Sequence, residues 1–252
     1  MDSETPDSLA NRAPDYVVTA AKAALGAVPF AGSLLAELAG SIIPNQRIVR
    51  IVAFAKELES RLSDADRRFV RTQLTNENFT DLMEESLRQV AKSVTQERRV
   101  RIAALIANSL TPKDVSYIES KQLLRILGEV NDVELIRLAW HLFEAFGDGT
   151  QYWEQHRGIL EPVAPTFGAP QPELDRSTLQ NSFDEHLAQL GLLSARHNVD
   201  HKTGQFVVDR HTGELEVRNY GITALGRLLL KQAGVEVDEE RANLRMEPTA
   251  PN

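Results

Sequence analysis

The sequence predicts a mostly α protein, in which an N-terminal helical bundle is followed by a smaller domain of helices and short strands. Two observations carry this prediction. Apolar residues recur every three or four positions through residues 47–110, which is the spacing of one face of an α-helix. After residue 190 the pattern changes to short segments separated by glycine-containing turns, which is typical of antiparallel strands. We place the bundle at residues 15–128 and the second domain at 131–234, with disordered tails at 1–14 and 235–252.

The composition narrows the class of protein. Of the 252 residues, 42% are hydrophobic and 25% are charged, which are globular proportions that disfavour disorder and a polytopic membrane protein. The net charge of -8 disfavours a protein that coats nucleic acid. The chain has no cysteine, which excludes disulfides, thiolate metal sites and cysteine nucleophiles. We therefore expect a soluble, helix-rich protein.

The segment 17–43 is rich in alanine and glycine and carries only two charged residues. It is long enough to span a bilayer, but Glu37 would be costly there and Pro29 interrupts the helix. We expect two short helices, residues 15–27 and 31–42, that form a hairpin buried in the bundle. The alternative is a membrane-seeking element.

The bundle continues with helices whose apolar faces follow from the spacing of their residues. The expected helices lie in residues 44–62, in a segment from Ser63 through Leu74, in residues 79–94 and in residues 97–110. The apolar face of the first is formed by Ile48, Ile51, Ala55, Leu58 and Leu62. The last is apolar on nearly every side from Val100 to Ile106, so we expect it to cross the middle of the domain until Thr111-Pro112 ends it.

A basic strip follows the apolar segment. Residues 47–71 hold seven Lys or Arg and four Asp or Glu, an excess of three positive charges. Such a strip attracts an anionic membrane surface, or it contacts the phosphates of a nucleic acid. The alternative is a solvated helix face with local ion pairs, which are routine on exposed helices. The candidate membrane or partner contacts are Arg47, Arg50, Arg61, Arg67, Arg68 and Arg71.

The C-terminal third begins with a capping box at Asn131 and Glu134, which predicts a helix through Phe143. The glycines and prolines of residues 147–175 predict a long irregular connection. Ser177 and Gln180 form a second capping box. It predicts a helix that ends at Gly191 and buries Leu179, Phe183, Leu187 and Leu190.

Three short antiparallel strands are expected after that helix, at residues 192–195, 205–209 and 214–218. A last helix follows, which Thr223 caps and Gly234 ends. This order of a helix, hairpin strands and a strand-to-helix exit at residues 220–227 resembles a winged-helix module over residues 131–234. The resemblance implies a winged-helix-like α+β domain.

In winged-helix proteins that bind DNA, the helix before the wing enters the major groove. Here that helix, residues 178–190, contains Asp184 and Glu185 and has no Lys or Arg. Residues 131–252 have a net charge of -8, from 11 basic and 19 acidic residues, whereas residues 1–130 are neutral with 17 of each. Repulsion from phosphate favours a module that contacts protein or is structural, and a DNA-binding transcriptional regulator is the alternative.

The search for chemistry yields no catalytic, cofactor-binding or metal residue. His197 and His201 lie beside Asp200, with His211 one hairpin away, but on a strand and turn rather than on one helix face. No phosphate-binding loop or nucleophile elbow is present in the sequence. We therefore expect no enzyme activity, no cofactor and no metal. A sensor for a small ligand is a further interpretation, with Tyr152, Trp153 and Phe167 near a pocket under residues 147–175.

The order of features is similar to that of bacterial abortive-infection proteins of the alpha class. The resemblance rests on the apolar segment 24–43, the sequence IPNQR at 43–47, the helix ERRVRIAALIANSL at 97–110 and the capped helix at Asn131. It implies a non-enzymatic interaction protein, a phage-defence or stress effector that acts through a membrane surface or a protein partner. The expected partners are a protein or a second copy of the chain, then an anionic membrane, with nucleic acid less favoured and small molecules open. The expected location is the cytoplasm, including the periphery of the inner membrane.

Overall fold

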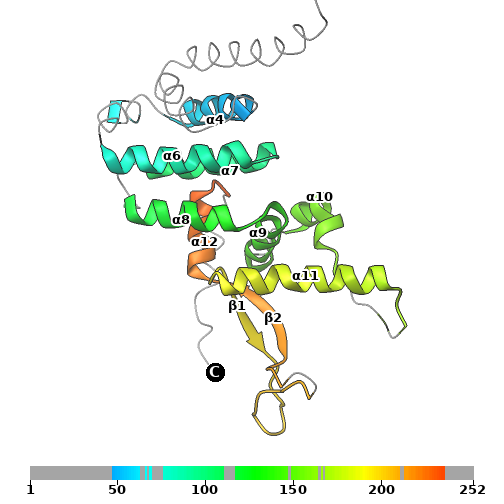
Figure 1. The fold of residues 1–252 in the computed structure, drawn as a ribbon. Helices are drawn as coiled ribbons and strands as arrows, with labels where there is room; N and C mark the ends of the chain where they lie inside the picture. The colour runs from blue at the N-terminus through cyan, green and yellow to red at the C-terminus, as the bar shows by residue number, and fades with distance from the viewer. Residues whose placement is uncertain are drawn as a thin grey trace, which may run out of the picture. The chain divides into compact units, whose positions relative to one another are not determined.

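The computed structural model describes residues 47–62, 66, 68–69, 76–110, 117–146, 149–163, 166, 168–210 and 213–235 (Figure 1). Helices account for 69% of these residues, in eight helices, and a two-stranded antiparallel sheet completes the secondary structure. The prediction of a mostly helical chain is confirmed. The predicted hairpin in residues 17–43, the N-terminal tail and residues 236–252 of the C-terminal tail lie outside the described residues, whereas Val235, predicted to begin that tail, is buried. The chain divides into two compact units, residues 1–128 with Gln232–Gly234, and residues 129–231 with 235–252.

The first unit is a bundle of α4 (Ile48–Arg61), α6 (Glu77–Lys92), α7 (Gln96–Ser109) and α8 (Tyr117–Glu129). Helix α7 packs against α4 and α6. Its residues from Ile102 to Ala107 are all buried, so the predicted central helix is confirmed. The predicted apolar face of α4 is also buried: it comprises Ile48, Ile51, Ala55, Leu58 and Leu62.

Two expectations for this unit were wrong or incomplete. The predicted face of the helix at 79–94 extended to Val94, but α6 ends at Lys92 and Val94 is 80% exposed. Helix α8 was not anticipated as an element, because its apolar spacing lies between two segments with stronger signals. Its buried side chains include Leu123, Leu124 and Leu127.

Arginines close the ends of several helices in the first unit. Arg50 on α4 donates to the carbonyl of Ala91 in the last turn of α6, at 2.7 Å. From α7, Arg98 donates to the carbonyl of Leu127 at 2.5 Å. Arg101 donates to the carbonyls of Ala233 and Gly234, at 3.4 and 3.1 Å. The last carbonyls of a helix lack partners within the helix and carry partial negative charge, so these cations stabilise helix ends.

The second unit contains α9 (Asp132–Phe146), α10 (Thr150–Leu160), α11 (Gln171–Gln189), β1 (Leu193–His197), β2 (Val217–Ile222) and most of α12 (Ala224–Gln232). Strands β1 and β2 are antiparallel, with Leu193 opposite Ile222 and His197 opposite Val217. Helix α9 packs against α10, α11 and β2. It is therefore the central helix of this unit.

Three terminal signals are confirmed. In the capping box, the amide of Asn131 donates to Glu134 Oε2 at 2.8 Å, and the amide of Glu134 donates to Asn131 Oδ1 at 2.9 Å. Helix α11 ends at Gln189 and is followed by Gly191, which has a φ of 74°; the amide of Leu192 donates to the carbonyl of Leu187. Thr223 Oγ1 accepts from the amide of Gly226 at 3.0 Å, at the start of α12.

The predicted irregular connection at 147–175 is wrong, because α10 occupies its first half. The predicted start of the following helix at Ser177 is also wrong. Helix α11 begins six residues earlier, after Pro170 and with a proline in its first turn, where the missing amide is not needed. The expected apolar face is only partly buried: Leu187 is inaccessible, whereas Leu179 is 58% exposed.

Of the three predicted strands, the first and third correspond in part to β1 and β2, whose bounds are Leu193–His197 and Val217–Ile222. The middle one, residues 205–209, is not a regular strand. It takes part in two isolated bridges, Val199 with Phe206 and Val208 with Leu215.

Candidate functional site

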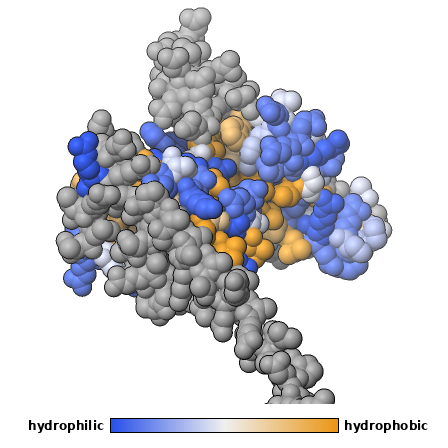
Figure 2. Space-filling view, turned by 90° about the horizontal axis from the view of Figure 1, so that it is seen from above, coloured by the Kyte–Doolittle hydropathy of each residue, from blue (hydrophilic) through white to orange (hydrophobic). Residues whose placement is uncertain are grey.

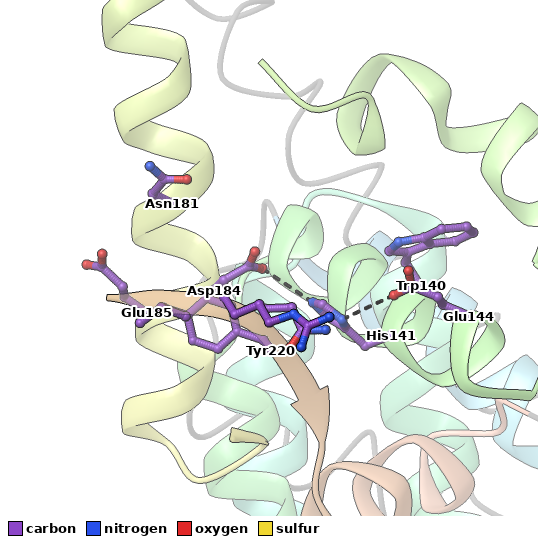
Figure 3. Close-up of a pocket in the computed structure, with 10 residues that line it drawn as sticks. Trp140, His141, Glu144, Asn181, Asp184, Glu185 and Tyr220 are labelled. Carbon is purple, nitrogen blue, oxygen red and sulfur yellow. Dashed lines mark ion pairs between the residues drawn. The ribbon is translucent and has the colours of Figure 1, made fainter. Parts of the chain in front are cut away.

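A cleft in the second unit brings together residues of α9, α11 and β2. Its volume is about 480 Å³, within the range of pockets that bind small ligands or side chains. The cleft is lined by Trp140, His141, Glu144, Asn181, Asp184, Glu185, Val217, Arg218, Asn219 and Tyr220. Figure 3 shows Trp140 and Glu144 on one side of His141, and Tyr220 and Glu185 on the other.

Asp184 of the cleft lining takes part in a largely buried ion pair between α9 and α11. Arg137 Nε donates to Asp184 Oδ1 at 2.9 Å, and its Nη2 donates to Oδ2 at 2.5 Å. The two side chains are only 14% and 11% exposed. This two-point geometry is the strongest form of the arginine–carboxylate contact, and it fixes the position of α11 on α9.

His141 extends the pair toward the surface. Its Nε2 lies 3.8 Å from Asp184 Oδ1, and its Nδ1 lies 3.8 Å from Glu144 Oε2 (Figure 3). The His141 side chain is 12% exposed, whereas that of Glu144 is 60% exposed. The imidazole therefore separates a buried carboxylate from an exposed one.

A second contact joins the same two helices. His186 Nδ1 lies 2.8 Å from Glu134 Oε1, while the other oxygen of Glu134 accepts the amide of Asn131. Glu134 is 3% exposed. The capping-box glutamate thus serves both the start of α9 and the packing of α11.

The cleft has a negative potential. Burial would raise the pKa of Asp184, but hydrogen bonds from His141 and Arg137 and the charge of Arg137 outweigh it, so the pKa lies below its ordinary value. At the other end, burial and the negative charges of Glu185 and Asp184 raise the pKa of Tyr220. Asp184 is thus ionised with both oxygens engaged by Arg137, which suits it to structure and electrostatics rather than proton transfer.

The other charged side chains of the cleft lining are Glu144, Glu185 and Arg218. Within the described part of the chain, Glu185 makes no hydrogen bond or ion pair, and the nearest partner of Glu144 is His141. Arg218 supplies one positive charge to the lining and pairs with none of its carboxylates. With Arg137 neutralising Asp184, the remaining lining has two carboxylates against one guanidinium, beside the aromatic rings of Trp140 and Tyr220.

The segment that runs from the end of β1 to the first residue of β2, residues 198–217, contains a tandem repeat, and we name this segment the double hairpin. The sequence NVDHKTGQF at 198–206 is followed by VVDRHTGEL at 207–215, with Asp, Thr and Gly in register. The hydrogen bonds repeat as well. The amide of Asp200 donates to the carbonyl of Gln205 and that of Asp209 to Glu214, at 2.9 and 2.8 Å. Both turns close through a glycine with positive φ, 70° at Gly204 and 76° at Gly213.

The double hairpin exposes apolar side chains. Of the twelve large apolar side chains exposed among the described residues, five lie in this segment. The two bridged pairs are equivalent in the repeat: Val199 with Phe206, 42% and 58% exposed, and Val208 with Leu215, 48% and 42% exposed. The fifth is Val217. Exposed apolar groups that are concentrated in one short segment are typical of an interaction surface. Figure 2 shows apolar residues exposed between hydrophilic areas on another view of the molecule.

The structure separates the predicted contact arginines by environment. Arg50 is half-buried and bound to the carbonyl of Ala91, and Arg61 forms an ion pair with Glu57 at 2.8 Å. Arg47 and Arg68 are exposed. Arg67 and Arg71 lie outside the described residues. The described arginines therefore differ from one another in burial and in their partners.

The histidine and aromatic candidates also separate. No group of three His, Asp or Glu among the described residues is arranged to hold a metal ion, and His211 lies outside them. Tyr152 and Trp153 belong to α10 rather than to a loop. Tyr152 stacks on Phe143 with ring centres 4.7 Å apart, and Trp153 lies against the guanidinium of Arg157 at 5.1 Å.

Sequence reasoning missed the two features that define the site. The contact between Arg137 and Asp184 joins residues 47 positions apart, which no local pattern reveals. The tandem repeat was accessible, because the two turns share Asp, Thr and Gly at a spacing of nine residues.

No described helix is long and apolar enough to cross a bilayer. Comparison of the chain with protein-family models, with curated proteins and with solved structures found no match.

Proposed function

We propose that this chain is a non-enzymatic interaction protein that uses the second unit to bind a protein partner. The single observation that supports the proposal most directly is the concentration of exposed apolar side chains on the double hairpin. The cleft adds carboxylates and aromatic rings, which are recognition groups rather than a catalytic set. The resemblance of feature order to abortive-infection proteins suggests the setting, a bacterial phage-defence or stress response in the cytoplasm or at the inner membrane.

A winged-helix-like arrangement is part of this proposal. Helix α11, β1, the double hairpin, β2 and the exit into α12 follow the expected order. In this interpretation the double hairpin is the wing, and it contacts protein. The exposed part of α11 supports this choice over DNA, because it presents Glu173, Asp175 and Glu185 against the single cation Arg176.

The proposal is tested by phage challenge. We expect a host expressing the wild-type chain to reduce plaque formation by phages of a panel, and Phe206→Ser with Leu215→Ser to abolish that protection. The matched control is Val49→Ser, which removes an equally exposed apolar side chain from the first unit, 57% exposed, and should retain protection. Equal protection by the hairpin variant, at equal soluble expression, would contradict the proposal. So would turnover of a nucleotide, nucleic acid or peptide that a point mutation abolishes.

A DNA-binding regulator is a second candidate, favoured by Lys202 and Arg210 at the turns of the double hairpin. Wing cations of this kind contact phosphates, so binding would weaken steeply with salt. Mobility-shift assays with duplex DNA at low ionic strength test whether the chain binds DNA. Failure to retard any duplex eliminates this candidate, whereas retardation that Lys202→Glu with Arg210→Glu removes would favour it over a protein partner.

Contact with an anionic membrane surface is the other route of action that the basic strip suggests. The exposed members of that strip among the described residues are Arg47, Lys56, Arg61 and Arg68, and Arg61 is paired with Glu57. Sedimentation of the full chain with anionic but not neutral vesicles, reduced by Arg47→Gln with Arg68→Gln, would support this route. Absence of the chain from both pellets would remove it.

A further inference from the structure

We infer that the cleft of the second unit binds a free basic amino acid, a small molecule with two cationic groups and one carboxylate. The inference goes beyond the proposed function, whose main support is the double hairpin, and it assigns the cleft a ligand of its own. It rests on the charges of the lining, on the two aromatic rings and on an irregularity in β2.

The available charges of the lining are opposite in sign to those of a basic amino acid. Asp184 is already held in the ion pair between α9 and α11. Neither Glu185 nor Arg218 forms a hydrogen bond or ion pair with another described residue, and the nearest partner of Glu144 is the imidazole of His141, at 3.8 Å. Carboxylates bind ammonium and guanidinium groups, and a guanidinium binds a carboxylate through two parallel hydrogen bonds. Two carboxylates and one guanidinium therefore suit a ligand with two cations and one carboxylate.

The guanidinium of the lining belongs to an irregular part of β2. Arg196 lies opposite Asn219 in the sheet. The next pair joins His197 to Val217, so Arg218 has no opposite residue. Such a bulge bends a strand and redirects its side chains, and bulges are frequent beside functional sites. It accounts for four consecutive residues of β2 that line one cleft, where a regular strand would turn alternate side chains to opposite faces.

The two aromatic rings of the lining each lie near one of the glutamates. Figure 3 shows Trp140 and Glu144 on one side of the His141 ring. Tyr220 and Glu185 lie on the other side. A cation placed beside an aromatic ring and a carboxylate is attracted by both. Because the two positions lie apart, one molecule fills both only if a chain separates its two cations, as in lysine and arginine.

The size of the cleft and its third charge favour the free amino acid over the same side chain in a protein. A volume of about 480 Å³ is ample for a molecule of this size. Within a peptide, the α-amine and the carboxylate are both converted into amides. A lysine or arginine side chain of a protein would therefore leave one glutamate and Arg218 without a partner, whereas the free molecule engages all three charges.

Titration calorimetry of the full chain with L-arginine and with L-lysine tests the inference. We expect one molecule to bind per chain, with a Kd below about 1 mM. Analogues of L-arginine that lack one of its charges should bind about tenfold more weakly. Agmatine lacks the carboxylate, L-citrulline lacks the side-chain cation, and Nα-acetyl-L-arginine lacks the α-ammonium group. This series uses the unchanged chain, so its result does not depend on the folding of any variant.

Substitutions in the lining identify which side chain meets which charge. Arg218→Gln should raise the Kd for L-arginine about tenfold but leave that for agmatine unchanged, because agmatine has no carboxylate. Glu144→Gln and Glu185→Gln should each raise the Kd for both molecules by about tenfold. The matched controls Arg210→Gln and Glu154→Gln each remove an exposed charge of this unit outside the cleft and should leave both Kd values unchanged.

A folding control accompanies the variants. Both tryptophans, Trp140 and Trp153, lie in the second unit, so their fluorescence during urea unfolding reports whether a variant has folded.

Three results would overturn the inference. The first is the absence of binding of either amino acid at about 10 mM. The second is equal affinity for L-arginine and Nα-acetyl-L-arginine, which would assign the cleft to a side chain of a protein partner. The third is binding that none of the changes in the lining weakens. None of these touches the proposed function, which the phage challenge with the Phe206 and Leu215 variant tests separately.

Discussion

The two units use their charged and apolar side chains in opposite ways. In the first, Arg50, Arg98 and Arg101 end on carbonyl groups of neighbouring helices, so charges that look available in the sequence are consumed by the fold. In the second, the double hairpin leaves two cations without described partners and five apolar side chains exposed. The comparison teaches that the number of charges in a segment does not identify a contact surface. What identifies it is whether the hydrogen-bonding groups and apolar area are satisfied internally.

The largest effect should come from the buried pair in the second unit. Arg137→Leu leaves Asp184 charged and without its two donors, which should lower the free energy of unfolding of this unit by about 3 kcal/mol. Urea unfolding, monitored by tryptophan fluorescence, measures this loss in the free energy of unfolding. The control is Arg157→Gln, whose pair with Glu161 has both side chains more than half exposed, and which should cost less than about 0.5 kcal/mol. An equal cost for both variants would contradict the assigned role.

The next largest loss of stability should come from disturbing the close packing at the start of α12. A Cβ at Gly226 would lie 2.4 Å from the carbonyl oxygen of Leu192 and 2.9 Å from Ile222 Cγ1. Gly226→Ala should therefore lower the free energy of unfolding by about 2 kcal/mol, because the backbone must move. Gly158→Ala, with no atom within 4 Å of the new Cβ, should be neutral or slightly stabilising. Tryptophan fluorescence compares the two, and a neutral Gly226→Ala would show that the contact yields easily.

The arginine contacts of the first unit predict a difference between two neighbouring members of the basic strip. Arg50→Gln removes a charged donor from the carbonyl of Ala91 and should cost about 1.5 kcal/mol. Arg47→Gln, at an exposed residue beside the N-terminus of α4, should change stability by less than about 0.5 kcal/mol. Circular dichroism during urea unfolding detects the loss, while tryptophan fluorescence should show the second unit unchanged. If both substitutions changed the free energy of unfolding by the same small amount, the contact of Arg50 with Ala91 would not contribute to stability, and Arg50 would again be a candidate contact residue.

Acid should remove the stability that depends on the charge of Asp184. Its pKa in the folded chain lies below the ordinary value of 3.8 because Arg137 and His141 outweigh burial. A lowered folded pKa means that this contribution is complete above the unfolded pKa and is lost as the pH falls through the folded one. Fluorescence unfolding between pH 5 and about pH 2.5 should show this loss in the wild-type chain. The free energy of unfolding should fall less steeply with decreasing pH in Asp184→Asn than in the wild-type chain. Identical slopes in the two chains would contradict the role assigned to the Asp184 charge.

The smallest effect on stability should come from the double hairpin. Phe206→Ser and Val208→Ser replace exposed side chains, so each should change the free energy of unfolding by less than about 0.5 kcal/mol. Leu187→Ser, at a residue with no accessible surface on α11, is the contrasting change and should be strongly destabilising. Fluorescence unfolding measures all three. A large loss of free energy of unfolding in the hairpin variants would mean that these side chains stabilise the fold rather than form a binding surface.

The sequence predictions that succeeded depend on residues that are close together in the chain. The apolar spacing from Ile48 to Leu62 and the capping box at Asn131 depend on residues within a few positions, and both are present in the structure. The capping-box pattern at Ser177 has the same form, yet it lies inside α11, because the proline-containing start at Gln171 sets that end. A local pattern therefore fixes a helix end only when no stronger signal lies nearby.

The basic strip shows a different limit of local patterns. Its arginines are adjacent in sequence, but Arg50 reaches a carbonyl 41 residues away and Arg61 reaches Glu57 on its own helix. A count of charges treats them as equal, and only the packing of α4 against α6 distinguishes them.

By itself, the sequence determined the helical class, the buried face of α4 and the turn chemistry of the double hairpin, since these depend on spacing and on the conformational preferences of glycine, proline and capping residues. Only the tertiary structure decided that Asp184 pairs with Arg137, that Arg101 donates to the carbonyls of Ala233 and Gly234, and that α9, α11 and β2 enclose a cleft. Those contacts join positions far apart in the chain, and their energies depend on distance and burial, which are properties of the packed chain.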